Sequence, residues 1–449
     1  MRLDSDGKIL CVMDGKRNVV LIFTPDLTPS GIENGRGVTG FSLMVDEYAR
    51  LLARHGKVVR VSCSSLKNPD LKIGDEYLLL ERSLWQIARH ARPGDWKHAF
   101  LYFLASCRLS RSARWRIFKQ RLSMGLYVKQ IRRSGAEVVF LQSFLPHIMP
   151  FVGAALHEKV PMALACHQAY DDRSPLFANY EGAFARYAVA PMVMNGIPVS
   201  GVGSGIARYF RQHVPECYWS RLHVIGNPIP EPDGMLGRKK DSGLFTIVVS
   251  GNIGERKNQS QVLRALACLP AEERSRLQVI FIGDDSTHGR IRRQAVEAGV
   301  ERLCRFMGRL SREETLRVTA GADLVLSATR SEGFGLPFIE GFSFGVPAVF
   351  FADIDAAAEL GDPKCAVLVR ERGDEALAEG ILQAMRTEWD REHIRRSVRE
   401  KFGPQAIAGQ HARLLGSASV PSLSEKRWDR MMLAYLRNKD GRFYPASDR

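Results

Sequence analysis

Two glutamates in the C-terminal half of the chain, Glu332 and Glu340, flank a Gly-Phe-Gly-Leu-Pro segment. Glu332 follows the apolar run 322–328, which predicts a buried strand, and Glu340 lies one turn into a helix that Pro337 is suited to open. Ionised carboxylates are strong hydrogen-bond acceptors, so two of them at one strand end could bind the hydroxyl groups of a sugar. A structural alternative is that both acids stabilise the N-terminal end of the helix.

Residues 251–258 (GNIGERKN) also have the composition of a binding loop. Gly251 and Gly254 permit a tight turn and a close backbone approach to a ligand. The loop precedes a predicted helix, whose first N–H groups attract anions, and Arg256 and Lys257 add two positive charges. We therefore expect a diphosphate site here, although the segment matches neither GxxxxGKS/T nor GxGxxG. The alternative is a solvated basic cap on a helix.

Other candidate residues follow predicted strands or lie in glycine-rich loops, and each also has a purely structural explanation. A histidine after a buried strand is more often packed than catalytic, and loop glycines often only permit turns. These candidates are His167 and His147, Gly308 with Arg309, Gly283 with Asp284 and Asp285, and the N-terminal loop glycines Gly31, Gly35, Gly37 and Gly40.

The sequence gives little indication of a bound metal or of disulfide bonds. Asp353 and Asp355 form a DxD triplet, which holds a divalent ion in some enzymes, but such triplets are common in unrelated sequences. No set of His, Asp and Glu residues has metal-ligand spacing. The eight cysteines include no CxxC pair, so we expect reduced thiols and neither a disulfide framework nor a zinc site. We therefore predict no metal and no cofactor.

Strand and helix patterns alternate along the chain and would place the candidate residues at strand ends. In the N-terminal half, short apolar runs predict strands, and residues 41–55 have helical spacing. A strand, a glycine loop, a helix and a second strand form a βαβ unit with parallel strands. The strands predicted in this half are residues 19–23, 58–63, 137–141, 162–166, 196–200 and 222–225.

The pattern restarts after residues 226–243, which are rich in proline, glycine and charge and predict a linker. We therefore expect an α/β protein with two doubly wound, Rossmann-like domains. The strands predicted in the second half are residues 245–250, 278–282, 303–307, 322–328 and 347–351. The expected parts are residues 1–235 with a basic helical segment at 82–133, residues 236–415, and a helical tail at 416–449.

Several of these motifs occur together in the order found in one enzyme family. Residues 321–349 (GADLVLSATRSEGFGLPFIEGFSFGVPAV) resemble the signature of family 4 retaining glycosyltransferases, the group 1 glycosyl transferases. GNIGERKN resembles that family's diphosphate loop, and residues 223–230 (HVIGNPIP) resemble the segment that closes its N-terminal domain. Residues 23–42 resemble its N-terminal glycine loop less closely. The resemblance implies a GT-B fold, in which two Rossmann-like domains face an interdomain cleft.

The resemblance also implies a reaction and a role for each motif. A hexosyl unit would pass, with retention and without a metal, from a UDP-, GDP- or ADP-sugar to a glycan or lipid-linked acceptor in cell-surface polysaccharide or lipopolysaccharide synthesis. Arg256 and Lys257 would hold the diphosphate. Glu332 and His167 would be the catalytic residues, and Glu340 would bind the ribose. The donor site would further include Gly251, Gly254, Gly308, Arg309, Gly333, Phe334, Gly335 and Leu336, with Gly35, Gly37 and Gly40 in the N-terminal loop.

Positive charge is concentrated in one stretch of the chain. The chain has 64 Lys and Arg against 49 Asp and Glu, a net charge of +15, and residues 82–133 carry thirteen of these cations and one acid, Asp95. Basic helices that also carry aromatic residues suit an anionic membrane surface, and a solvated helix face is the alternative. The aromatic residues in this stretch include Trp85, Trp96, Phe100, Tyr102, Trp115 and Phe118.

The composition of the chain is not that of a disordered protein or of a membrane-spanning protein. A content of 45% hydrophobic and 25% charged residues is typical of a packed protein, and no apolar run approaches the roughly 18 residues of a membrane-spanning helix. Because the N-terminus lacks a signal-peptide pattern, we expect a cytoplasmic protein, peripheral on the inner face of the membrane. Two other functions stay open: a GT-B-like phosphorylase or epimerase, and a nucleic-acid-binding protein. No nucleic-acid recognition module is present, so nucleic acid is not an expected partner.

Overall fold

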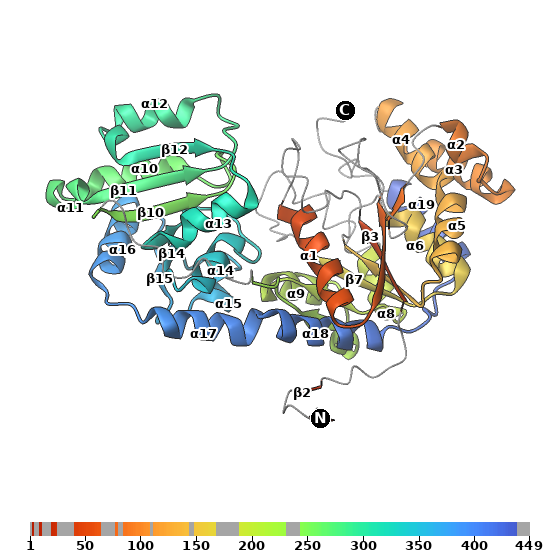
Figure 1. The fold of residues 1–449 in the computed structure, drawn as a ribbon. Helices are drawn as coiled ribbons and strands as arrows, with labels where there is room; N and C mark the ends of the chain where they lie inside the picture. The colour runs from red at the N-terminus through yellow and green to blue at the C-terminus, as the bar shows by residue number, and fades with distance from the viewer. Residues whose placement is uncertain are drawn as a thin grey trace. The chain divides into compact units, whose positions relative to one another are not determined.

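The computed structural model describes residues 2–3, 9–10, 19–24, 40–63, 77–79, 84–107, 111–142, 148–167, 188–229 and 243–437. The chain divides into two compact units, whose elements are shown in Figure 1. The N-terminal unit comprises residues 1–202, 206–225 and 407–449, and the C-terminal unit comprises residues 203–205 and 226–406. The sequence placed the boundary at residue 235 and treated residues 416–449 as a separate tail, whereas this segment clusters with the N-terminal unit.

The C-terminal unit is built on a six-stranded sheet whose neighbouring strands are all parallel. The strand order is β12-β11-β10-β13-β14-β15, which is the 3-2-1-4-5-6 order of a Rossmann-like sheet counted along this unit. The order of the chain therefore reverses between β10 and β13. The strands are β10 (Phe245–Ser250), β11 (Leu277–Ile282), β12 (Cys304–Gly308), β13 (Leu324–Leu326), β14 (Ala348–Phe351) and β15 (Ala366–Val369).

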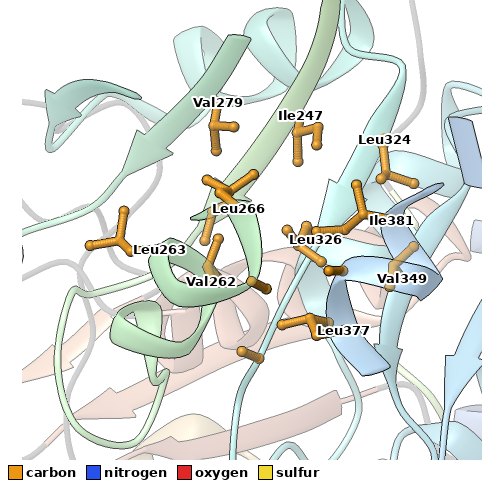
Figure 2. Packing of buried hydrophobic residues seen from close by; sticks show 14 of the residues in the cluster. Ile247, Val262, Leu263, Leu266, Val279, Leu324, Leu326, Val349, Leu377 and Ile381 are labelled. Carbon is orange, nitrogen blue, oxygen red and sulfur yellow. The ribbon is translucent and has the colours of Figure 1, made fainter. Parts of the chain in front are cut away.

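Helices cover both faces of this sheet, which explains why its strands are continuous apolar runs. On one face, Ile247 of β10 packs with Leu266 of α10 and Ile381 of α16 in the cluster shown in Figure 2. On the other face, Phe338 of α14 stacks on Phe350 of β14, with ring centroids 4.3 Å apart. The helices are α10 (Gln259–Cys268), α11 (Ala271–Ser275), α12 (Arg290–Glu297), η4 (Glu301–Leu303), α13 (Arg312–Ala320), α14 (Leu336–Ser343), α15 (Ala357–Leu360), α16 (Asp374–Arg386) and α17 (Arg391–Phe402).

The N-terminal unit contains a seven-stranded sheet, also parallel throughout, in the order β5-β4-β3-β6-β7-β8-β9. Here the chain order reverses between β3 and β6. The strands are β3 (Val19–Thr24), β4 (Val58–Cys63), β5 (Tyr77–Leu79), β6 (Val138–Leu141), β7 (Met162–Cys166), β8 (Val199–Gly201) and β9 (Leu222–Val224), and a separate antiparallel pair is formed by β1 (Arg2–Leu3) and β2 (Ile9–Leu10).

The helices associated with the N-terminal sheet range in length from five to 15 residues. None of the helices in the described part of the chain combines the length and the apolar composition that crossing a membrane requires. The helices are α1 (Gly40–Arg54), α2 (Leu84–Ala88), α3 (Pro93–Ala105), α4 (Arg111–Leu122), α5 (Met124–Ser134), α6 (Met149–Glu158), α8 (Ala190–Met194), α9 (Ser204–Arg211), η3 (Glu216–Arg221), α18 (Pro404–Ser417) and α19 (Glu425–Arg437).

The predicted strands of both halves are present, with bounds that differ by a few residues. Two strands of the parallel sheets were not predicted: β5, which pairs with β4, and β15, which follows residues 347–351 and pairs with β14. β15 lies at the edge of the sheet and has only four residues, Ala366–Val369. In the sequence, such a short apolar run is only weak evidence for a strand. The strand is stabilised by pairing with its neighbour β14, which the sequence pattern does not reveal.

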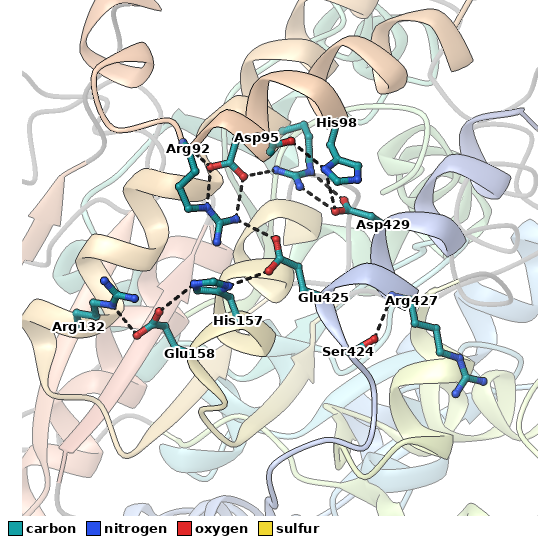
Figure 3. Close-up of polar contacts among 12 residues, drawn as sticks. Arg92, Asp95, His98, Arg132, His157, Glu158, Ser424, Glu425, Arg427 and Asp429 are labelled. Carbon is teal, nitrogen blue, oxygen red and sulfur yellow. Dashed lines mark hydrogen bonds and ion pairs between the residues drawn. The ribbon is translucent and has the colours of Figure 1, made fainter.

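Buried charges join α3, α4 and α19 in the N-terminal unit (Figure 3). Arg121 is 2% exposed and donates two hydrogen bonds to Asp429, at 2.9 and 2.8 Å, and one to Asp95, at 2.9 Å. The hydroxyl group of Tyr102 also donates to Asp429, at 2.8 Å. Asp95 also accepts hydrogen bonds from Arg92, at 2.9 and 2.8 Å, so two carboxylates balance two guanidinium groups, and Asp429 holds α19 against α3 and α4.

We expect Asp429→Ala to lower the free energy of unfolding by about 3–5 kcal/mol, because Arg121 would keep a buried charge without its bidentate partner. Urea denaturation followed by circular dichroism measures this change. Arg430→Ala, at an exposed position of the same helix, is the control and should change stability by no more than about 0.5 kcal/mol. Equal effects of the two substitutions would contradict the structural role of the network.

Candidate functional site

The two loops singled out in the sequence follow adjacent strands of the C-terminal sheet. Residues 251–258 follow β10, and residues 327–335 follow β13, its parallel neighbour. The carboxyl ends of parallel strands meet at one edge of a sheet, and ligands of doubly wound sheets bind where the strand order reverses. β10 and β13 flank that point of reversal. The fold therefore places both loops where a ligand site is expected.

Hydrogen bonds connect these two loops directly. The backbone N–H of Arg330 donates to the carbonyl of Arg256 at 2.9 Å, and the hydroxyl group of Thr329 donates to the same carbonyl at 3.2 Å. The guanidinium of Arg256 donates in return to the carbonyl of Ser331 at 3.1 Å. These contacts fix the position of the basic pair relative to the segment that carries Glu332.

Lys257 and Glu332 form an ion pair at the centre of this arrangement. The Nζ atom of Lys257 lies 2.5 Å from Oε2 of Glu332, and the two side chains are 12% and 18% exposed. The guanidinium of Arg256 lies 4.0 Å from the same oxygen and is 54% exposed. Burial alone would raise the pKa of the Glu332 carboxyl, but the charge and hydrogen bond of Lys257, assisted by Arg256, hold that pKa below its usual value. Glu332 is therefore ionised at neutral pH.

Two glycines are required by the geometry of these loops. Gly251 has φ +132°, and a Cβ atom there would lie 3.0 Å from Cε of Lys257. Gly335 has φ +85°, and a Cβ atom there would lie 2.4 Å from the ring of Phe338. A larger residue at either position would strain the backbone and disturb the loop. The N–H group of Gly254 donates to the side chain of Gln259 at 3.1 Å, which stabilises the start of α10.

The remaining predicted residues of the second loop are mainly structural. Phe334 is 3% exposed and makes an edge-to-face contact with Phe402, with ring centroids 5.1 Å apart. It therefore anchors the loop from inside the unit. Gly333 is buried beside it, and Leu336 is the first residue of α14.

Glu340 lies in α14 with a basic partner of its own. Its side chain is 5% exposed and forms an ion pair with Arg312, the first residue of α13. The two glutamates of the predicted sugar site thus have separate partners, Lys257 for Glu332 and Arg312 for Glu340. Arg312 was not predicted as a site residue, and the only signal for it in the sequence was its position three residues after Arg309.

Gly308 and Arg309 lie at the end of β12, near the loop after β11. The N–H group of Gly283 donates to the carbonyl of Gly308 at 2.8 Å, and Arg309 pairs with Asp284 at 3.2 Å. Both members of that pair are more than a third exposed, so their attraction contributes little to stability. Asp285 accepts hydrogen bonds within its own turn, from the N–H groups of residues 287 and 289.

The DxD triplet has local partners in the structure. Both carboxylate oxygens of Asp353 accept hydrogen bonds from Arg372, at 2.8 and 2.7 Å. Asp355 lies beside Gly205, where a Cβ atom would be 2.1 Å from its carboxyl carbon. Asp353 thus pairs with a cationic side chain of the same unit.

In the N-terminal unit, His167 immediately follows β7, and its Nε2 atom lies 2.8 Å from the side-chain oxygen of Gln142. Gln142 immediately follows β6 and was not predicted as a site residue. The rings of Tyr48 and His167 are 5.6 Å apart, and those of Tyr48 and His411 are 4.5 Å apart. Burial, reinforced by His411, lowers the pKa of His167 to about 3. Gly40 is the first residue of α1, whereas Gly31, Gly35, Gly37 and His147 lie outside the described residues.

Burial also lowers the pKa of His411 to about 4, which makes the stability of this unit depend on pH. Between the unfolded value of 6.5 and about pH 4, the unfolded chain binds a proton that the folded chain does not, so stability falls as pH falls. Acidification from pH 7 to pH 5 should cost wild type about 2 kcal/mol more than it costs His411→Phe. Urea denaturation of both proteins at the two pH values measures the difference, and identical pH dependence would contradict the burial of a neutral His411.

Comparisons of the sequence with known proteins point to one family. Residues 237–401 match the family described as glycosyl transferases group 1. O-antigen chain mannosyltransferase B of Escherichia coli is 33% identical over 144 residues, which are 32% of this chain and 37% of that protein. The chain thus matches little more than a third of the length of this curated relative.

Comparison with solved structures supports the fold over most of the chain. The structure of HepE from Anabaena, in complex with UDP and glucose, has a TM-score of 0.61 at 15% identity and covers 89% of this chain and 99% of its own. WaaG, a glycosyltransferase involved in lipopolysaccharide biosynthesis, has a TM-score of 0.57 at 15% identity and covers 88% of this chain and 99% of its own. The expected α/β fold of GT-B type is therefore confirmed, and the match to the glycosyl transferases group 1 family covers residues 237–401.

Proposed function

We propose that the chain is a retaining glycosyltransferase of family 4 that moves a hexosyl unit from a nucleotide-diphosphate sugar to a glycan or lipid-linked acceptor. The observation that carries this proposal is the Lys257–Glu332 pair, held at the reversal point of the C-terminal sheet. HepE was solved with UDP and glucose, and the mannosyltransferase relative belongs to O-antigen synthesis, which supports a sugar nucleotide and a cell-surface glycan as substrates.

The basic side chains of the first loop suit a leaving diphosphate. Negative charge grows on the diphosphate as the glycosidic bond to it breaks, and fixed positive groups stabilise that charge without reorganisation. Lys257 is largely buried, Arg256 is half-exposed, and α10 begins two residues later. The N–H groups of its first turn add to the positive field. We propose that these groups replace a metal ion in the transfer step.

The two glutamates suit different parts of the donor. Glu332 is ionised and lies beside the basic pair, so it can accept hydrogen bonds from hydroxyl groups of a sugar attached to the diphosphate. Glu340 is held by Arg312, and we propose that it binds the ribose. Gly251, Gly335 and the cross-loop hydrogen bonds position these groups, while Gly308 and Arg309 complete the edge of the donor site.

His167 is proposed to contact the donor sugar or position the acceptor. With a pKa near 3, its imidazole is neutral at physiological pH and is a weak proton acceptor. A neutral ring can still donate or accept one hydrogen bond. We therefore propose that the leaving phosphate itself takes the proton of the acceptor hydroxyl group, and we assign no protein nucleophile.

Substitution of either member of the ion pair should stop transfer without unfolding the protein. We expect Lys257→Ala to lower kcat by about 100- to 1,000-fold, because it removes a preorganised positive charge, and Glu332→Gln to have an effect of similar size. Radiolabelled transfer to an acceptor extract measures activity. Thermal shifts with UDP-, GDP- and ADP-sugars identify the donor, since a ligand at about 100 times its Kd stabilises the folded state by about 2.7 kcal/mol.

The matched controls lie on an exposed face of α13, where Glu313 and Arg317 also form an ion pair. Glu313→Gln and Arg317→Ala should retain wild-type activity. Wild-type activity in both Lys257→Ala and Glu332→Gln would refute the proposed site. Release of free sugar phosphate, or epimerisation of the donor without an acceptor, would instead indicate a phosphorylase or an epimerase.

We further propose that α2, α3 and α4 dock on an anionic membrane at its inner face. Trp96, Phe100 and Leu104 are 44%, 55% and 48% exposed and, at intervals of four residues, form one stripe along α3. Trp85 of α2 and Trp115 of α4 are also exposed, as are Lys97, Arg111 and Lys119. Tyr102 and Phe118, the other two aromatic residues named in this stretch, are buried and do not belong to this surface. Amphipathic helices with aromatic and basic side chains bind the interface of anionic bilayers.

The double substitution Trp96→Ser and Phe100→Ser should weaken binding to vesicles of phosphatidylcholine and phosphatidylglycerol by about tenfold or more. The reason is that burying one such side chain is worth about 1.5–3 kcal/mol. Co-sedimentation measures the bound fraction, and added salt should reduce it further. Val420→Ser, which changes another exposed apolar residue, is the control. Equal binding of the double variant and wild type would show that this surface does not contact the membrane.

A further inference from the structure

Three metal-ligating side chains converge in the C-terminal unit away from the candidate site. Asp362, Cys365 and His393 each offer one ligand atom, and these three atoms all lie within 4.8 Å of one another. Cys365 is 3% exposed, and Asp362 and His393 are half-buried. We propose that this cluster binds one zinc ion, a site that is independent of the proposed transfer reaction.

An unsatisfied histidine supports this proposal. The Nε2 atom of His393 is buried and has no hydrogen-bond partner among the residues that the structure describes. Buried polar atoms in native proteins nearly always have a partner, so a histidine that belongs to this cluster and has an orphaned ring nitrogen is a good candidate for a metal ligand. A metal ion bound by this nitrogen would satisfy it.

The donor set selects zinc over the hard cations. Zinc is commonly held by cysteine sulfur, histidine nitrogen and carboxylate oxygen, whereas Mg²⁺ and Ca²⁺ prefer oxygen ligands alone. Three protein ligands leave the fourth tetrahedral position for water. On binding, a Zn–S bond forms, and the proton of the Cys365 thiol leaves to solvent. The hydroxyl group of Ser397, 3.4 Å from the Cys365 sulfur, can then hydrogen-bond the thiolate.

The position of the cluster indicates a structural role for the ion. Cys365 immediately precedes β15, so it lies at the amino end of that strand, whereas the candidate site follows the carboxyl ends of β10 and β13. His393 lies in the first turn of α17, which begins at Arg391. Zinc would therefore join α17 to the turn that leads into β15. Loss of zinc should lower thermal stability while leaving binding of a sugar nucleotide unchanged.

The sequence did not predict this site because its ligands do not form a known zinc pattern. Asp362 and Cys365 are separated by two residues, and His393 follows only after α16. No cysteine has a second cysteine at CxxC spacing. The histidine reaches the other two ligands only through the packing of α17, which contacts α14 and, through Ser397, the Cys365 thiol.

The test uses the full-length protein, dialysed against a chelator and then against zinc. We expect wild type to retain one zinc ion per chain by mass spectrometry, and its cobalt form to show the near-ultraviolet absorption of a thiolate–Co²⁺ bond. Cys365→Ser and His393→Gln should each weaken zinc binding by more than about 100-fold, since even outer-shell partners contribute about 10- to 100-fold.

Cys268→Ser, which removes an exposed thiol, is the matched control and should keep both zinc and the cobalt absorption. The proposal is overturned if wild type retains no zinc and shows no thiolate–Co²⁺ absorption. This measurement uses wild type alone, so it does not depend on whether the variants fold. It is also overturned if both ligand variants bind zinc as wild type does. Retained zinc in a wild-type protein without transferase activity would leave this site standing and contradict only the proposed function.

Discussion

Lys257 and Glu332 are 75 residues apart in the chain, yet their charged atoms are 2.5 Å apart. The contact follows from the sheet: β10 and β13 are parallel neighbours, so the loops that leave them meet. Either charge would be costly to bury alone. Each loop therefore supplies the opposite charge that the buried side chain of the other loop requires. A buried ion pair adds little net stability compared with apolar packing, so its presence at the reversal point of a Rossmann-like sheet fits a ligand-binding role better than a structural one.

The protein uses its excess of basic residues in more than one way. Arg121 belongs to the most basic stretch of the chain but is buried between Asp95 and Asp429, where it joins three helices. Lys97 and its exposed neighbours in the same stretch face solvent, beside the apolar stripe of α3. Arg256 and Lys257 instead converge on one carboxylate in the other unit. The net charge alone therefore does not indicate function, because basic residues of this chain have structural roles in some places and lie at the surface or at the candidate site in others.

Much of the fold and part of the candidate site could be predicted from the sequence, because local physical rules determine them. Apolar runs gave the strands, and the loops after β10 and β13 were recognised from glycine and charge. Side-chain pairing across the fold could not be predicted, because it depends on how helices pack: Arg312 with Glu340, Gln142 with His167, and Asp353 with Arg372. The same limitation hid the convergence of His393 with Cys365, and the four-residue strand β15 was too short to identify.

The central claim is that a diphosphate binds against Lys257 and Arg256 while Glu332 faces the attached sugar. A crystal structure of the full chain with its sugar nucleotide tests this claim most directly. The account predicts diphosphate oxygens within hydrogen-bonding distance of the Lys257 ammonium and the Arg256 guanidinium, and a sugar hydroxyl group on the Glu332 carboxylate. A nucleotide bound elsewhere, with the Lys257–Glu332 contact unchanged and no phosphate near it, would contradict the account.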